Sequence, residues 1–394
     1  MSNRNCVIFG AGALGLAFLG PELGGEYDLT YVDIPQKAGL LDHMNSAGWY
    51  VFNETGPASR SERITGIRGI AVTEEQKVQA ALATADLVFT AVGEPNLHKV
   101  APTLAKAVAR RSEKDPLRVL CCENGLQIAR KCRENIRKSL GGDPGESLIV
   151  GDTVMGRMCK IVQPLQAHIE PVTPDADWAV CGEPFFGLPV RRALMAGLDR
   201  PGEAFQVMSR EEFSAQEDVK MLAHNGLHAF LSFLGTLKKA EYFCELTDDP
   251  LLMRMAARLL REESAPALLK KHGRALGRNF FYNYAPTILR RITCPGLHDP
   301  LSRGTRGAMR KLQPWERLVG SLRTVARQDI EPVMFATGIA AAILVARRRE
   351  ETQMDFHSIL TQHCDLDEED EADLIGLCEK RRRWVAEEFD PGTA

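Results

Sequence analysis

The sequence predicts an α/β N-terminal domain, built on a doubly wound and mostly parallel sheet, followed by a mostly α-helical C-terminal domain. Between residues 5 and 130, short apolar runs alternate with stretches of helical periodicity, which is typical of a parallel sheet covered by helices on both faces. From about Glu211 onward the strand signal fades and helical periodicity dominates. A chain of 394 residues is also longer than one hydrophobic core usually supports, about 250 to 300 residues. We therefore expect two domains, 1–205 and 206–394.

The expected sheet has four clear strands. Each is a short apolar run that ends beside a polar or glycine-containing loop, which is where parallel strands carry their ligands. These strands cover residues 5–9, 29–32, 86–90 and 117–121, and two weaker candidates, 148–150 and 178–180, would extend the same sheet.

Helical periodicity marks the second half of the chain. The expected helices cover residues 218–239, 250–272, 331–349 and 370–388. Between them, residues 285–314 contain four prolines and several glycines, so we expect a long loop there, and loops of this length in compact domains are often functional. The apolar run 333–346 is shorter than the roughly 20 residues that span a bilayer, so we expect it to form a buried helix.

Composition favours chemistry on a small molecule. A formal net charge of −3 and an isoelectric point near 6.3 offer no cationic footprint for nucleic acid or for an anionic membrane. The apolar run that begins at Cys6 is interrupted by Gly10 and Gly12, which is typical of a strand entering a turn and not of a signal peptide. We therefore expect a cytoplasmic monomer or homodimer that binds neither nucleic acid nor membrane.

A glycine motif directly follows the first strand. Gly10-Ala11-Gly12-Ala13-Leu14-Gly15 has the GxGxxG spacing and precedes an apolar run, 16–19, that can begin a helix. In a Rossmann domain the first glycine allows a tight turn, the second lets the backbone approach a pyrophosphate, and the third lets helix and strand pack closely. The free N–H groups at the start of the helix would bind the phosphates. This context predicts a dinucleotide-binding Rossmann domain.

An acidic residue ends the second strand. Asp33 lies eighteen residues after Gly15, where a carboxylate would accept hydrogen bonds from the adenosine ribose hydroxyls. The same charge would repel a 2′-phosphate, so we expect the cofactor to be NAD and not NADP. Ala91, Val92 and Gly93 end a later strand and would line the same crevice. The alternative is a glycine turn without a ligand and a surface or helix-capping Asp33.

Polar groups interrupt the helix expected at 218–239. Four of them fall on one side of the helical cylinder at about 100° per residue, so they can face one cavity. Oxidising an alcohol needs a base for the hydroxyl proton and donors that hold the alkoxide. A lysine removed from water has a lowered pKa and could be that base, with an asparagine and a histidine as hydrogen-bonding groups. The four residues are Lys220, His224, Asn225 and His228.

Two other interpretations of this helix stay open. Lys220 could extend its stem along apolar surface and keep its ammonium in solvent, while the histidines lie satisfied in the core. His224 and His228 also have the i, i+4 spacing of a zinc-protease helix. Asn225 stands where such a helix carries its glutamate base, so we expect no metal.

These residues resemble the polyol-specific long-chain dehydrogenases, the family of the mannitol-1-phosphate 5-dehydrogenases and the mannitol 2-dehydrogenases. The most specific match is the family's pattern of a lysine, four residues, an asparagine, two residues and a histidine, which Lys220, Asn225 and His228 fit. Further matches lie at 9–12, 18–20, 86–93 and 122–124. The resemblance covers most of the chain.

The resemblance implies roles for individual residues. Lys220 would be the general acid/base, and Asn225 and His228 would polarise the reacting oxygen. Asn124 falls where the family has an asparagine near the nicotinamide and the substrate, and a run of arginines in the family helps to bind the polyol. Several cations in one loop could also clamp a phosphate, with Arg303 and Lys311 as the preferred pair. The expected substrate-binding residues are Asn124, Arg157, His224, Arg303, Arg306 and Lys311.

The resemblance leaves the substrate open. The chain length is close to that of the bacterial mannitol-1-phosphate enzymes, which favours mannitol 1-phosphate and a ketose of the fructose 6-phosphate type. Two positions depart from the family pattern, because Leu16 replaces an arginine and Gly156 replaces an aspartate. The glycine motif with a lysine–asparagine helix is also similar to ketopantoate reductase, a shorter family that prefers NADPH. A non-catalytic NAD-sensing protein is the remaining alternative.

Overall fold

The computed structural model describes residues 4–56, 59–125, 127–198, 201–277 and 280–389. The chain divides into two compact units, residues 1–213 and 214–394. The boundary expected from the sequence, 205/206, falls inside the strand β12 (Phe205–Met208).

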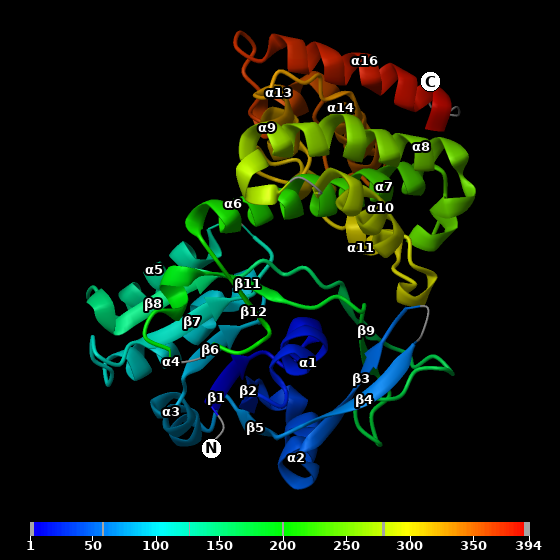
Figure 1. Cartoon of the computed structure of the whole chain (residues 1–394). Helices are drawn as coiled ribbons and strands as arrows, with labels where there is room; N and C mark the ends of the chain where they lie inside the picture. Colours follow the sequence, from blue (N-terminus) through cyan, green and yellow to red (C-terminus); the bar gives the residue numbers. More distant parts are fainter. Residues whose placement is uncertain (1–3, 57–58, 126, 199–200, 278–279, 390–394) are drawn as a thin grey trace. The chain divides into compact units, whose positions relative to one another are not determined.

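A six-stranded parallel sheet forms the centre of the first unit (Figure 1). Its strand order is β5-β2-β1-β6-β7-β8, so the chain winds outward from β1 in both directions, and the predicted doubly wound α/β class is confirmed. The strands are β1 (Arg4–Phe9), β2 (Tyr27–Asp33), β5 (Ile67–Ala71), β6 (Leu87–Thr90), β7 (Leu117–Cys121) and β8 (Leu148–Asp152).

Alternate side chains of β1 enter two separate hydrophobic cores. Cys6 and Ile8 pack in one core with α2, whereas Val7 and Phe9 pack in the other with α3, α4 and α5. Because both faces of the sheet are covered, its strands are continuous apolar runs, which is why the sequence showed them. The helices are α1 (Gly20–Leu23), α2 (Ala38–Ala47), α3 (Glu75–Ala83), α4 (Leu97–Val108) and α5 (Ile128–Leu140).

A second, four-stranded sheet in this unit differs from the prediction. The candidate strand at 178–180 does not extend the parallel sheet, because β10 lies between β3 and β9 in the second sheet, whose order is β4-β3-β10-β9. Two short strands, β11 and β12, pair with each other in a separate sheet. The additional strands are β3 (Trp49–Glu54), β4 (Arg60–Thr65), β9 (Cys159–Val162), β10 (Ala179–Gly182), β11 (Leu188–Arg191) and β12 (Phe205–Met208).

The second unit is helical, as predicted. Its apolar helix α14 is buried along most of its length, as the run 333–346 indicated, and it contacts α7 and α16. The helix α6 (Arg210–Val219) leads into this unit. The other helices are α7 (Gly226–Leu237), α8 (Pro250–Arg258), α9 (Ala265–Leu276), α10 (Phe280–Ile292), α11 (Leu301–Thr305), α12 (Ala308–Lys311), α13 (Val319–Ala326), α14 (Val333–Arg348), α15 (Phe356–Ser358) and α16 (Ala372–Phe389).

The prediction of a long loop at 285–314 is wrong. This segment contains the second half of α10 and the short helices α11 and α12. The two short helices are only 5 and 4 residues long, so neither gives a helical period that a sequence reveals.

Two of the expected long helices are interrupted by wide π-helical turns. The helix expected at 218–239 is α6 and α7 joined through η6 (Lys220–Asn225), and the helix expected at 250–272 is α8 and α9 joined through η8 (Leu259–Ser264). Two further turns of this kind are η1 (Gly15–Leu19) and η10 (Ile359–His363). π-turns inside helices are rare and occur frequently at functional sites.

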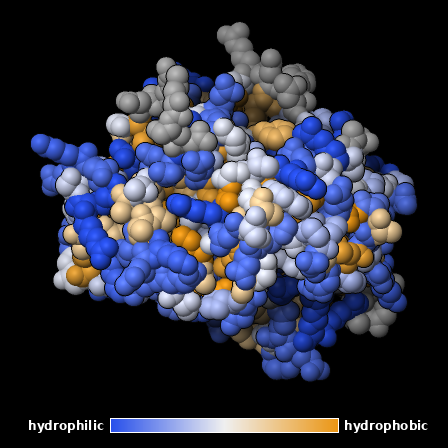
Figure 2. All heavy atoms as spheres, turned by 90° about the horizontal axis from the view of Figure 1, so that it is seen from below, coloured by the Kyte–Doolittle hydropathy of each residue, from blue (hydrophilic) through white to orange (hydrophobic). Residues whose placement is uncertain are grey.

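The surface is polar where it can be seen. The face drawn in Figure 2 is mostly hydrophilic, with scattered hydrophobic side chains. In the part of the chain that the structure describes, no helix is both long and apolar enough to cross a bilayer.

Candidate active site

The glycine turn of the first unit leaves open space beside one of its three glycines. Gly10 has a φ of +107°, and a Cβ there would lie 2.5 Å from the carbonyl oxygen of Ala91. A Cβ on Gly15 would collide with the carbonyl of Gly10. At Gly12, in contrast, a Cβ would meet no atom of the described residues within 4 Å. Packing therefore requires glycine at positions 10 and 15, while the open space beside Gly12 fits the close approach of a pyrophosphate.

Asp33 is bound to the same turn. Its Oδ2 accepts a hydrogen bond from the backbone N–H of Ala11 over 2.6 Å, and its Oδ1 accepts one from the N–H of Ile34 over 2.7 Å. These bonds fix a half-buried carboxylate beside the start of the helix, which Ala13 and Leu14 begin. The arrangement suits a group that accepts hydrogen bonds from ribose hydroxyls.

A buried glutamate ties together the ends of β6 and β7. Glu123 accepts a hydrogen bond from the Thr90 hydroxyl over 2.8 Å and another from the Val92 N–H over 3.1 Å. Burial raises the pKa of this carboxyl. Sequence reasoning gave Glu123 no role, because the apolar strand before it does not distinguish a buried acid from a surface one. The residues expected to face a coenzyme at this edge are Ala91 and Val92, which are half-buried, and Gly93 and Asn124, which are exposed.

Arg157 takes a buried position in the first unit. Its Nε donates to the carbonyl of Phe185 over 2.7 Å, its Nη1 donates to the carbonyl of Ala17 over 3.1 Å, and its Nη2 lies 3.4 Å from Oε1 of Glu22. The guanidinium also lies over the rings of three phenylalanines. These contacts all lie within the first unit, and the substrate contact expected of Arg157 stays a prediction.

Both departures from the family pattern fit their packing. Leu16 is fully buried in the core on one face of the sheet, where an arginine would lose its hydration. A Cβ on Gly156 would collide with the ring of Phe185, so an aspartate there would require that ring to move.

In the second unit, Lys220 and Asn225 lie at the two ends of the π-turn η6. The N–H of Gly226 donates to the carbonyl of Met221, five residues earlier, where an α-helix would bond to the fourth. Because each hydrogen bond of a π-turn spans five residues, Lys220 and Asn225 lie about one turn apart on one side of the helix. Both side chains are half-buried, as are those of His224 and His228.

Three contacts hold the start of this turn in place, and sequence reasoning missed all of them. Asp218 binds Nε2 of His272 over 2.5 Å and Nζ of Lys271 over 2.7 Å. The Tyr284 hydroxyl donates to the carbonyl of Val219 over 3.2 Å. Helices α9 and α10 therefore anchor the residues that precede Lys220.

Positive charge gathers around the two histidines. Burial lowers the pKa of His224 well below its usual range, and the charges of Arg291 and Lys220 add to this effect. Burial also lowers the pKa of His228, although Asp299 opposes that shift. Both rings are therefore neutral near pH 7. Arg291 is a half-buried cation that the sequence did not single out. Among the described residues, no group of three or more histidines, cysteines, aspartates and glutamates is placed to hold a metal ion.

Asp299 joins His228 on α7 to Arg303 on α11. Its Oδ1 accepts a hydrogen bond from Nε of Arg303 over 2.7 Å, and its Oδ2 accepts one from Nη2 of Arg303. The same Oδ2 lies 3.4 Å from Nε2 of His228. Burial alone would raise the pKa of Asp299, but the bonds from His228 and Arg303 hold it well below its usual range. The structure thus brings His228 and Arg303 together through an ionised carboxylate.

The two other cations predicted to bind substrate lie in different surroundings. Lys311 is 4% exposed, and its Nζ donates to the carbonyls of Gly304 and Arg303 at the end of α11. Burial, with the nearby charge of Arg317, lowers the pKa of Lys311 to about 7. Arg306 is exposed.

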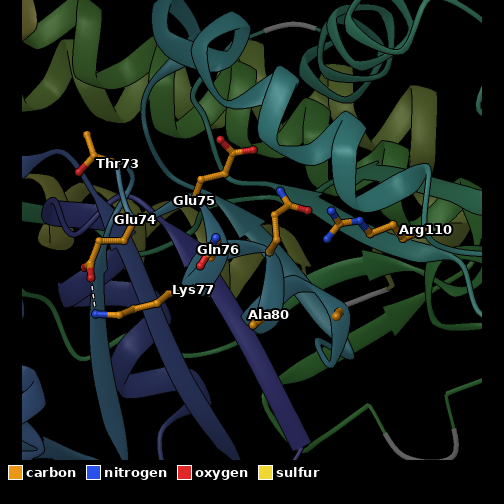
Figure 3. A pocket seen from close by; sticks show the side chains of 9 residues that line it. Thr73, Glu74, Glu75, Gln76, Lys77, Ala80 and Arg110 are labelled. Carbon is orange, nitrogen blue, oxygen red and sulfur yellow. Dashed lines mark hydrogen bonds and ion pairs between the residues drawn. The ribbon is translucent and has the colours of Figure 1, made fainter.

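A separate pocket lies on the first unit and has a different lining. Its side chains come from α3, the residues just before it, and Arg110 (Figure 3). Glu74 and Lys77 form an ion pair at its rim. None of the predicted site residues is among those that line it, so this pocket is not part of the candidate active site.

Two family models match the chain. The mannitol dehydrogenase Rossmann domain matches residues 4–149, and the mannitol dehydrogenase C-terminal domain matches residues 213–372. Together the two matches cover well over half of the chain.

Curated relatives align along almost the whole chain. The mannitol-1-phosphate 5-dehydrogenase of Shouchella clausii (strain KSM-K16) is 28% identical over 345 residues, which cover 86% of this chain and 87% of the relative. The enzyme of the same name from Caldanaerobacter subterraneus subsp. tengcongensis is 28% identical over 387 residues, which cover 95% of this chain and 96% of the relative.

Solved structures share the fold at low identity. A ternary complex of Pseudomonas fluorescens mannitol 2-dehydrogenase with NAD and D-mannitol has a TM-score of 0.74 at 15% identity, covering 99% of this chain and 93% of that one. A substrate-free D-sorbitol dehydrogenase has a TM-score of 0.72, also at 15% identity, covering 98% of this chain and 94% of that one.

Proposed function

The chain belongs to the mannitol dehydrogenase family, and from this premise we propose that it interconverts a polyol phosphate, such as mannitol 1-phosphate, with the corresponding ketose phosphate. As a member of this family it is an NAD-dependent polyol dehydrogenase. The match of both halves to one family favours this function over a ketopantoate reductase. Relatives named for a phosphorylated polyol support the phosphorylated substrate.

The first unit fits NAD. The open space at Gly12 accommodates a pyrophosphate, and the carboxylate of Asp33, held by Ala11, would accept from the ribose hydroxyls and repel a 2′-phosphate. When bound, NAD supplies the acceptor for the hydride that leaves the alcohol carbon. Glu123 keeps the ends of β6 and β7 in register at the same edge of the sheet.

The π-turn η6 is the observation that carries the proposed chemistry. In alcohol oxidation the neutral amine of Lys220 would take the hydroxyl proton, and in ketose reduction its ammonium would return that proton. Asn225, which the turn brings onto the same face, would hydrogen-bond the reacting oxygen. His228, one helical turn further along, would hold a hydroxyl of the substrate.

The charges around the turn favour an anionic substrate. Lys220 and Arg291 both act on His224, and Arg303 acts on both histidines. Asp299 is ionised, but Arg303 binds both of its oxygens. A phosphate group would gain charge-assisted hydrogen bonds from such a cluster, whereas an uncharged sugar would gain weaker ones.

A comparison of fructose 6-phosphate with fructose, each with NADH, tests this proposal. We expect kcat/KM to be at least about 100-fold higher for the phosphate, because hydrogen bonds to a charged group contribute about 1.5 to 3 kcal/mol each. Equal turnover of the two sugars would remove the phosphate from the proposal. Tight NADH binding with no turnover of any ketose would indicate a sensor, and NADPH-dependent reduction of ketopantoate would indicate the other reductase family.

A further inference from the structure

We propose that Asp299 is a positioning residue that locks His228 and Arg303 into one hydrogen-bonded unit and orients the imidazole so that Nδ1 accepts a hydrogen bond from a substrate hydroxyl. This inference rests on the proposed function of the second unit and adds a residue to it. Asp299 lies 71 residues from His228 in the sequence, and no motif marks it.

The contacts of Asp299 place one carboxylate between two predicted site residues. Arg303 donates to both oxygens in a bidentate arrangement, and Nε2 of His228 lies 3.4 Å from Oδ2. The carboxylate is 3% exposed, whereas the side chain of Arg303 is 44% exposed, so water reaches the guanidinium more readily than the carboxylate. Bidentate guanidinium–carboxylate pairs fix geometry as well as charge.

The backbone around Asp299 is anchored independently of its side chain. Its carbonyl accepts a hydrogen bond from the Phe243 N–H over 3.1 Å, and the Leu301 N–H donates to the carbonyl of Glu241 over 2.8 Å. Gly304 lets α11 pack closely on α7, because a Cβ there would collide with Ser232. The side chain is therefore not needed to hold α11 in place, which leaves it for orienting its two partners.

The charge of Asp299 determines where the imidazole proton lies. An ionised carboxylate only accepts hydrogen bonds, so its contact with Nε2 requires the proton of the neutral ring to be on Nε2. Nδ1 then carries a lone pair and accepts from a hydroxyl. In this arrangement His228 holds the polyol through an accepted bond, whereas the resemblance to the family implies that His228 polarises the reacting oxygen.

Several groups around His228 influence its titration. Asp299 comes from the segment before α11, Arg303 from α11 itself, Arg317 from the segment before α13, and His224 from the same helical run. The ring of Phe243 lies beside the imidazole, with 4.4 Å between centroids and 37° between the ring planes. Asp299 opposes the effect of burial on His228 most strongly, so its removal should lower the pKa of the imidazole.

The first test needs only the wild-type protein. Long-range proton–nitrogen correlation spectra of the histidine rings, with His228 assigned through His228→Gln, give the protonation state of each ring nitrogen. We expect His228 to be neutral at pH 7.5 with its proton on Nε2. A proton on Nδ1 would overturn the proposal, and this readout does not depend on activity.

The second test uses Asp299→Asn and Asp299→Ala. We expect kcat/KM for the polyol phosphate to fall on the order of 10- to 100-fold, as for other partners that orient a histidine. We also expect the acidic limb of the pH profile of kcat/KM to move to lower pH. NADH affinity should stay within about twofold, because the glycine turn lies in the other unit. The proposal would be overturned by folded variants that keep the wild-type kcat/KM, the wild-type acidic limb of its pH profile and the wild-type ring-nitrogen chemical shifts of His228.

Glu263→Gln is the matched control. This carboxyl group is also 3% exposed in the second unit, but it binds the backbone of Met334 and Phe335 instead of a site residue. We expect a lower Tm with an unchanged acidic limb and unchanged His228 ring shifts. If the wild type turns over no ketose phosphate, the proposed function fails, whereas the ring-nitrogen spectra still decide the role of Asp299.

Discussion

The backbone N–H of Ala11 donates a 2.6 Å hydrogen bond to Oδ2 of Asp33, which couples the glycine turn after β1 to the acidic end of β2. The two features that the sequence assigned separately to the pyrophosphate and to the ribose are therefore held in one fixed geometry. Substitutions in the glycine turn and at Asp33 should therefore both change coenzyme binding, but for different physical reasons.

Gly12→Ala should weaken NADH binding without loss of stability. The added methyl meets no described protein atom within 4 Å, but it would occupy the space that a pyrophosphate needs. We expect Kd to rise at least about tenfold, equivalent to ~1.4 kcal/mol, with an unchanged Tm. NADH fluorescence titration and thermal unfolding measure the two quantities.

Gly10→Ala is the matched comparison in the same turn. Here the methyl would press on the carbonyl of Ala91 in a backbone with a φ of +107°, so we expect a loss of about 1 to 3 kcal/mol of stability. If Gly12→Ala binds NADH as tightly as the wild type, the turn does not hold the pyrophosphate.

Asp33→Asn should relax the choice between coenzymes. The amide keeps the size of the side chain but loses the charge that repels a 2′-phosphate. We expect the ratio of kcat/KM for NADH over NADPH to fall by about tenfold or more. Asp42→Asn, an exposed change on α2, should leave the ratio as it is. An unaltered ratio in Asp33→Asn would show that specificity lies elsewhere.

Arg303→Ala should affect phosphorylated and free sugars differently. Loss of the guanidinium removes a charge-assisted donor and leaves Asp299 without its bidentate partner, so we expect KM for fructose 6-phosphate to rise about 10- to 100-fold. Arg258→Ala removes a comparable i, i+4 ion pair, with Glu262, from an exposed helix surface. Equal effects of the two variants would contradict a role of Arg303 in substrate binding.

Glu263 should make the protein less stable as pH rises. Burial raises the pKa of this carboxyl to about 8, although the N–H groups of Met334 and Phe335 at the start of α14 oppose the shift. Between the unfolded value of about 4.5 and pH 8, the folded protein keeps a proton that the unfolded chain has released, so this contribution is present at pH 4 and lost by pH 8.

Urea unfolding of wild type and Glu263→Gln at pH 5 and at pH 7 measures this contribution. We expect the stability difference between the two proteins to narrow by roughly 1 to 3 kcal/mol over that interval. Lys311, with a folded pKa of about 7, makes the protein more stable as pH rises above that value, so its effect lies mostly outside this interval. Parallel stability curves for the two proteins would contradict a raised pKa at Glu263.

The sequence predicted those parts of the fold in which one signal dominates. The strands β1, β2, β6 and β7 are buried on both faces, so their apolar runs stand out, and α14 is apolar on every side. The strand β4 has mostly exposed polar residues and shows no such pattern. The helices α11 and α12 are too short to show a period, so the segment was taken for a loop.

The candidate site was predictable only where it is local in sequence. Spacing placed Lys220, Asn225 and His228 on one helix, but it gave no sign of the π-turn that alters their relative directions. Asp299, from the segment before α11, joins the site by contacting His228, and the charge of Arg291 on α10 acts on His224. The burial of Arg157 by Glu22 and two backbone carbonyls depends on the folded core and leaves no mark in the sequence.

The role of Lys220 is tested most directly by comparing Lys220→Met with Lys238→Met, a lysine of the same unit that pairs with Asp249. In each variant, NADH affinity and the rate of fructose 6-phosphate reduction are measured together. We predict that Lys220→Met binds NADH within about twofold of the wild type but loses on the order of 10²- to 10⁴-fold in kcat, with partial rescue by added methylamine. A Lys220→Met enzyme that turns over at the rate of Lys238→Met would contradict proton transfer by this residue.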